Sequence, residues 1–284
     1  MIRTANSQTN PGEAKALLAD VFSEGPFRFR LGTRPGDAAN FFAATELHDE
    51  ILAERQHWLT SDAARYAVLL PEGEPALDAA IEQIAGMPKN LLAEAAPFER
   101  LLALGRFWEP DFVLLRRDAA GQMVVVGGCV CFPTNWRLTD KLNEPVGEVH
   151  EIVPGLNANI GAPIDNFLSR MKPGCWERSN WGMARSDQRN QHPDLHLLGL
   201  SADTIIDDVW LRIEDQALVP LPEVAGVLFG IRVRHVQLGE VIQNPIARER
   251  LRTAIETMSP EMMAYKNLTT IRQRLVGWLS APSI

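Results

Sequence analysis

His150 has the surroundings that most favour chemistry in this sequence, because it lies between Glu148 and Glu151 in a loop that ends at Pro154 and Gly155. A neutral imidazole can transfer a proton or bind a metal through one ring nitrogen while the other nitrogen makes a hydrogen bond. Either glutamate, or a carbonyl group of the loop, could accept that bond. A loop histidine can equally be a solvated side chain, and these residues alone leave both interpretations open.

A second group of candidates lies in the β-rich part of the chain. Arg212, Glu214 and Gln216 alternate along one run, so a strand would place them on one face. Such a face is either the solvent side of a half-exposed sheet or the polar wall of a ligand cavity, where an arginine can bind a carboxylate through two hydrogen bonds. Periodicity alone favours the solvent side. Further polar candidates in neighbouring runs are Arg178, Asn180 and Arg232.

Several classes of protein are disfavoured. The sequence has no phosphate-binding glycine loop, no serine nucleophile elbow, no H-E-x-x-H zinc motif and no C-x-x-C-H haem attachment motif. A net charge of −8 is a poor match for nucleic acid or an anionic membrane. Three cysteines favour core thiols in a reducing compartment. We see no signal peptide and no membrane span, so we expect a soluble, cytoplasmic protein.

The elements that must position these residues are predicted as an α+β domain over 1–284. Residues 1–107 form a mostly helical lead-in, 108–240 the sheet core and 241–284 the C-terminal helices. In the lead-in, a helix from 38 to 59 follows Asp37 and places Arg55 on its solvent side. Gly127-Gly128 inside a strand predicts a bulge or a close backbone approach. The antiparallel sheet has about five strands, at 111–117, 123–132, 176–183, 209–219 and 225–238.

Six short motifs in order resemble the haem-dependent oxidative N-demethylase family, over about 26–240. The motifs are Cys131-Phe132-Pro133-Thr134-Asn135-Trp136, Leu138 with Lys141-Leu142, His150 with Val153-Pro154-Gly155, Arg178-Ser179-Asn180-Trp181, Leu211-Arg212 with Glu214, Gln216 and Leu218, and Phe229 with Ile231-Arg232. The resemblance implies a PAS-like sheet that binds haem b non-covalently through an axial histidine. It also implies oxygen-dependent removal of a methyl group from a small secondary amine such as dimethylamine, with release of formaldehyde.

Carried over by position, the resemblance makes His150 the axial ligand of the haem iron. Arg212 and Glu214 become the catalytic candidates, since Glu214 could hold a protonated amine and Arg212 could meet a propionate or the substrate. The remaining cofactor-binding candidates are Arg178, Asn180, Trp181, Gln216 and Arg232. No flavin or iron–sulfur motif is visible, so a separate reductase partner is implied. The alternatives are a non-catalytic haem- or small-ligand-binding PAS-like sensor, and a scaffold whose polar strand residues face solvent.

Overall fold

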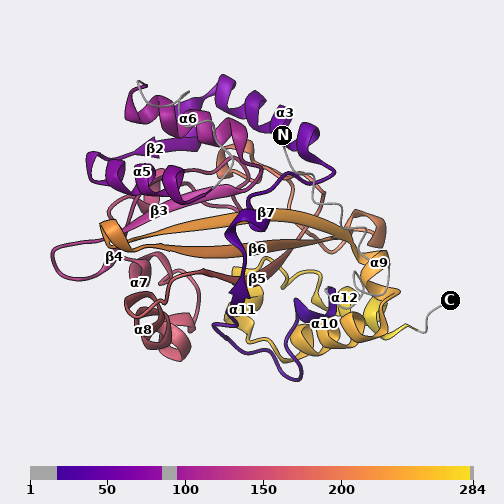
Figure 1. Cartoon of the computed structure of the whole chain (residues 1–284). Coiled ribbons are helices and arrows are strands. Elements are labelled where there is room, and N and C mark those ends of the chain that lie inside the picture. The colour runs from indigo at the N-terminus through magenta and orange to yellow at the C-terminus, as the bar shows by residue number, and fades with distance from the viewer. Residues whose placement is uncertain (1–17, 85–94, 282–284) are drawn as a thin grey trace.

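One antiparallel sheet of seven strands runs through the molecule, with helices packed around it (Figure 1). The structure is a computed structural model that describes residues 18–84 and 95–281. The strand order is β1-β5-β6-β7-β3-β4-β2. The strands are β1 (Arg34–Gly36), β2 (Ala67–Leu69), β3 (Asp111–Arg117), β4 (Met123–Cys129), β5 (Cys175–Ala184), β6 (Trp210–Leu221) and β7 (Gly226–Gln237). The predicted α+β class is confirmed.

The predicted count of five strands is wrong, because the lead-in contributes two more. The five long strands fall where the β-rich runs predict them. β1 and β2 have only three residues each, and they pair with β5 and β4 at the two edges of the sheet. Three residues are too few to produce an alternating pattern, so the sequence gives no signal for such short edge strands.

Three apolar clusters hold the helices to the sheet. α5 and α6 pack against the face that carries Phe112 and Leu114, whereas α8 packs against the face that carries Val113 and Leu115. α10, α11 and α12 pack against the N-terminal part of β6, which contains Leu211 and Ile213. The helices are α2 (Ala38–Phe41), α3 (His48–Ser61), α4 (Ala63–Tyr66), α5 (Glu74–Gln83), α6 (Pro97–Phe107), α7 (Val146–Val149), α8 (Ala162–Ser169), α9 (Leu238–Ile242), α10 (Pro245–Thr257), α11 (Pro260–Tyr265) and α12 (Arg272–Ser280). Among residues 18–84 and 95–281, no helix has the length and apolar character that crossing a membrane requires.

The predicted helix from 38 to 59 is two helices, and Arg55 is not on its solvent side. Asp37 caps α2, where its carboxylate accepts from Asn40 N at 3.0 Å, but the helix ends at Phe41 and α3 begins at His48. Arg55 is completely buried and donates to Asp111 at 2.6 Å and to the Gly105 carbonyl at 2.6 Å. A buried, ion-paired arginine has the same place in a helical pattern as an exposed one, which is why the pattern fails here.

Gly127 and Gly128 lie at a bulge, as predicted. The register between β3 and β4 shifts between Leu114 and Leu115. Gly128 has a φ of 154°, and a Cβ there would lie 2.4 Å from the Phe112 carbonyl oxygen. Only glycine fits such a close approach by a neighbouring strand. A bulge bends the strand that carries it, which here is β4.

Candidate functional site

β5, β6 and β7 place a polar group on one face of the sheet. Arg178 lies directly opposite Gln216, and Asn180 lies directly opposite Glu214. Residues that are directly opposite in paired strands share a face, and so do alternate residues of one strand. The structure therefore brings together Arg178, Asn180, Arg212, Glu214 and Gln216. Arg212 is only 1% exposed, so this face is not simply the solvent side of the sheet.

Trp181 and Arg232 lie on the opposite face, away from this group. Trp181 pairs with Ile213, and Arg232 pairs with Asp215. The Trp181 ring packs edge-on against Phe22 with 5.3 Å between centroids. Arg232 forms an ion pair with buried Glu109 and donates to the carbonyls of Phe41 and Ala43. These two residues support the sheet from behind the polar face.

The Glu214 carboxylate accepts hydrogen bonds at both oxygens. Thr134 Oγ1 donates to Oε1 at 2.6 Å, and Gln216 Nε2 donates to Oε2 at 3.0 Å. Thr134 Oγ1 in turn accepts from Arg212 Nε at 2.8 Å. Because a guanidinium can only donate, the single hydroxyl hydrogen of Thr134 must point to Glu214. The chain of bonds from Arg212 through Thr134 therefore fixes Glu214 as a hydrogen-bond acceptor.

Arg212 is the buried member of the polar face, and its guanidinium donates hydrogen bonds to groups of the protein. Its Nη1 donates to the Arg189 carbonyl at 2.9 Å, and its Nη2 donates to the Phe132 carbonyl at 2.7 Å. Nη1 also lies 3.1 Å from His235 Nε2, which must accept. Burial, aided by the charge of Arg212, lowers the pKa of His235 to about 3, so this ring stays neutral. Burial likewise lowers the pKa of Arg212 to about 10. Arg212 thus holds two loops and Thr134 in place.

Arg178 has unused donors. Its side chain makes no hydrogen bond or ion pair with the described residues, and Nε is buried without a partner. Burial lowers the pKa of Arg178, while the charge of Glu214 acts in the opposite direction. A guanidinium that is partly removed from water without a carboxylate fits an anion supplied from outside the chain.

Thr134 in the polar group and Lys266 beside Trp181 were not identified as site residues from the sequence. Lys266 Nζ donates to the Trp181 carbonyl at 2.6 Å and lies 4.8 Å from the centroid of the Trp181 ring. Burial lowers the pKa of Lys266 to about 8, with Glu214 opposing this effect. Thr134 lies in the motif Cys131–Trp136, but that motif did not predict a role for it. Lys266 follows α11, far along the chain from β6, and only the tertiary structure places its charge near Glu214.

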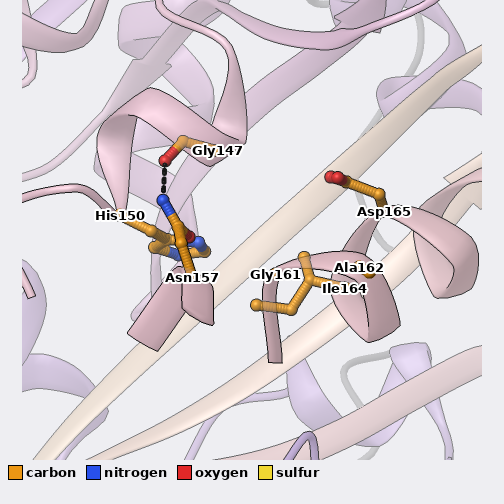
Figure 2. Close-up of a pocket in the computed structure, with 7 residues that line it drawn as sticks. All are labelled: Gly147, His150, Asn157, Gly161, Ala162, Ile164 and Asp165. Atoms are coloured by element: carbon orange, nitrogen blue, oxygen red, sulfur yellow. Dashed lines mark hydrogen bonds between the residues drawn. The ribbon is translucent and has the colours of Figure 1, made fainter. Parts of the chain in front are cut away.

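His150 follows α7 and lines a cavity of about 280 Å³ (Figure 2). Burial, followed by the charge of Arg178, lowers the pKa of His150 and favours the neutral ring. Neutral imidazole is the form that ligates a metal. Nδ1 is buried without a partner among the described residues, so neither Glu148 nor Glu151 accepts a hydrogen bond from it. The cavity is lined by Gly147, His150, Asn157, Gly161, Ala162, Ile164 and Asp165.

These residues fit one axial ligand and one anion partner of a haem. Arg178 is close enough to His150 to lower its pKa and close enough to Glu214 to be affected by that carboxylate, so it connects the cavity to the polar face. Among residues 18–84 and 95–281, no three His, Cys, Asp or Glu side chains gather as they would around a protein-bound metal ion. A haem iron needs only axial ligands from the protein, because the porphyrin supplies the other four nitrogens.

The cavity alone is small for a porphyrin, and part of the polar face is open. Its volume is at the low end for small-ligand pockets. On the polar face, Asn180 is exposed although it lies within β5. A Cβ added to Gly182, which pairs with Arg212 on the same face, would have no atom within 4 Å. These two positions of the polar face are therefore uncovered by other side chains.

Comparison with known protein families gives a match over residues 82–276. The matching family is described as haem-dependent oxidative N-demethylase, alpha subunit-like. The matched segment exceeds half of the 284-residue chain and includes His150, the polar face and Lys266. The chain therefore belongs to the haem-dependent oxidative N-demethylase, alpha subunit-like family.

Proposed function

We propose that this chain binds haem b non-covalently through His150 and oxidatively demethylates a small secondary amine such as dimethylamine. The proposal rests chiefly on one observation: the neutral ring of His150 lies near the guanidinium of Arg178, which has no partner among the described residues. The first is what an axial ligand requires, and the second fits a carboxylate such as a haem propionate. The family supports haem dependence and oxidative chemistry. We infer that the sheet binds haem in a PAS-like manner.

Bound haem would supply the activation of O₂ and the oxidation of a methyl C–H bond, which side chains do not perform. The residues of the chain would bind and orient. His150 would offer a ring nitrogen to the iron, and Arg178 would pair with a propionate. Glu214 would accept a hydrogen bond from the protonated amine and so direct its methyl groups. Asn180 and Gln216 would complete the wall around the amine.

The balance of charge around Glu214 also supports haem. Arg178, Arg212 and Lys266 all lie close enough for Glu214 to influence their pKa values. Asp111 and Glu54 also act on Arg212. Glu214 is the one carboxylate among the described residues whose charge acts on Arg178 and Lys266. Two cations that share one carboxylate leave an excess of positive charge in a partly desolvated site, which is costly unless an anion enters. The two propionates of haem would offset this excess.

Electrons would come from a separate reductase, and the family description as alpha subunit-like supports an assembly with further components. We see no flavin or iron–sulfur motif in the sequence. A reducing cytoplasm would suit the three free, buried cysteines.

Absorbance spectra and formaldehyde release test the proposal. We expect a Soret band in the purified or haem-reconstituted wild-type chain that is lost or shifted in His150→Ala. His57→Ala is the matched control, because His57 is exposed on α3, and its spectrum should be that of the wild type. With O₂, dimethylamine and a reductant, the wild type should release formaldehyde. An unchanged spectrum in His150→Ala would refute the ligand assignment, and haem binding without amine oxidation would indicate a sensor instead.

A further inference from the structure

Two polar atoms in the His150 cavity are buried without hydrogen-bond partners among the described residues. They are His150 Nδ1 and Asn157 Oδ1, and both residues line the cavity. Figure 2 shows the Asn157 amide bonded to Gly147, with the His150 imidazole behind it in that view. A buried polar atom without a partner costs about 1–3 kcal/mol, so two such atoms in one place call for an explanation.

The orientation of the Asn157 amide follows from its other contact. Asn157 Nδ2 donates to the Gly147 carbonyl at 2.8 Å. A carbonyl only accepts, so the NH₂ group must face Gly147 and Oδ1 must be the atom left at the cavity. The same Gly147 oxygen accepts from the backbone N–H of His150 at 3.2 Å. One carbonyl therefore fixes both the amide and the backbone of the histidine.

We propose that Asn157 is a positioning residue that selects the tautomer of His150. Its Oδ1 accepts a hydrogen bond from Nδ1–H once the ring turns toward it, and Nε2 then carries the lone pair. This is the arrangement that a histidine ligand needs, because the bond at one nitrogen orients the ring and raises the basicity of the other. The role as a ligand rests on the proposed function, whereas the tautomer does not.

The local fold supports this assignment. Asn157 begins a π-helical turn, Asn157–Gly161, directly before α8. Such turns often occur at functional sites, because the extra residue changes which side chain points inward. Other groups near the ring are Arg178, Asp165 and Lys141. Asp165 is exposed on α8, while Arg178 Nε is the one competing donor that is buried and unpartnered there among the described residues. If Arg178 donated to Nδ1, the ring would have to carry its proton on Nε2.

The tautomer can be read without haem. Nitrogen-15 spectra of the haem-free, full-length chain report which ring nitrogen is protonated, and His150→Ala identifies the signals of His150 among the six histidines. We expect Nδ1–H in the wild type. Asn157→Asp keeps an acceptor and should keep Nδ1–H, whereas Asn157→Leu should shift the ring toward Nε2–H. Nε2–H in the wild type, or unchanged Nδ1–H in Asn157→Leu, would overturn the proposal.

Haem binding provides the second readout. Removing such a partner of a metal ligand typically weakens metal affinity by about 10–100-fold, so Asn157→Leu should release haem faster by a factor in that range. The reduction potential should rise in Asn157→Leu and fall in Asn157→Asp. Asn159→Leu is the matched control, because exposed Asn159 makes the same kind of bond to the Gly155 carbonyl at 2.7 Å. Wild-type release and potential in Asn157→Leu, with haem still lost in His150→Ala, would overturn this role alone. A haem spectrum unaffected by His150→Ala would instead overturn the proposed function.

Discussion

Replacing Thr134 by valine should destabilise the protein by about 2–4 kcal/mol. Valine preserves the shape of the side chain but removes the hydroxyl that connects Arg212 to Glu214. A hydrogen bond to a charged group contributes about 1.5–3 kcal/mol, and a buried donor left without an acceptor costs about 1–3 kcal/mol. Arg212 Nε bears the full cost of a lost acceptor, because this residue is only 1% exposed. The cost at Glu214 is smaller, because this carboxylate is half-buried and water can replace the lost hydroxyl.

Urea unfolding of the wild type, Thr134→Val and Thr134→Ser would measure this effect. Serine retains the hydroxyl, so Thr134→Ser should lose less than about 1 kcal/mol. A double-mutant cycle of Thr134→Val with Glu214→Ala isolates the bond between the two side chains, because alanine has no acceptor, and we expect a coupling of about 1 kcal/mol or more. Thr134→Val as stable as the wild type, or no coupling in the cycle, would show that the hydroxyl does not hold Glu214.

Two further predictions concern buried cations. Arg55→Met should lower the free energy of unfolding by about 3–5 kcal/mol, because it leaves Asp111 as an uncompensated buried carboxylate; a loss below about 1 kcal/mol in urea unfolding would contradict the ion pair. Burial lowers the pKa of Lys266 from 10.5 to about 8. Between pH 8 and 10.5 the unfolded chain therefore binds more protons than the folded chain. The free energy of unfolding of the wild type should rise with pH over this range, relative to that of Lys266→Met. The rise should be about 1–3 kcal/mol once the partial exposure of the side chain is allowed for. The same pH dependence of the free energy of unfolding in both proteins from pH 8 to 10.5 would refute this prediction.

The sequence predicts the long strands well because each one has an unambiguous local pattern. Gly127-Gly128 even marks the bulge, since a close approach between backbones excludes any side chain. Arg55 is the opposite case. Its burial depends on Asp111, which follows α6 and is far along the chain, and no local pattern in α3 contains that information.

The candidate site shows the same division between local and tertiary information. Alternation correctly places Arg212, Glu214 and Gln216 on one face of β6. Alternation within Arg178-Ser179-Asn180-Trp181 would likewise have placed Trp181 on the face opposite Asn180, because the two residues are adjacent. Arg232 is different, since its face depends on the register that sets it opposite Asp215, and register between strands is not encoded in either strand alone.

The tertiary structure also changes what Glu214 can do. From the sequence, Glu214 is a carboxylate that could hold a protonated amine. In the fold, three cations already lie near it, and Lys266 is one that no pattern in β6 could predict. Asp111 and Glu54 also act on Arg212, but Arg178 and Lys266 share Glu214. A protonated amine entering alone would add another positive charge beside that carboxylate, which Coulomb repulsion in a partly desolvated site disfavours. If haem propionates take up Arg178 and offset a second cation, Glu214 becomes available to the amine. Under the proposed function, the order of binding follows from charge, because haem would have to be in place before Glu214 could hold a cationic amine.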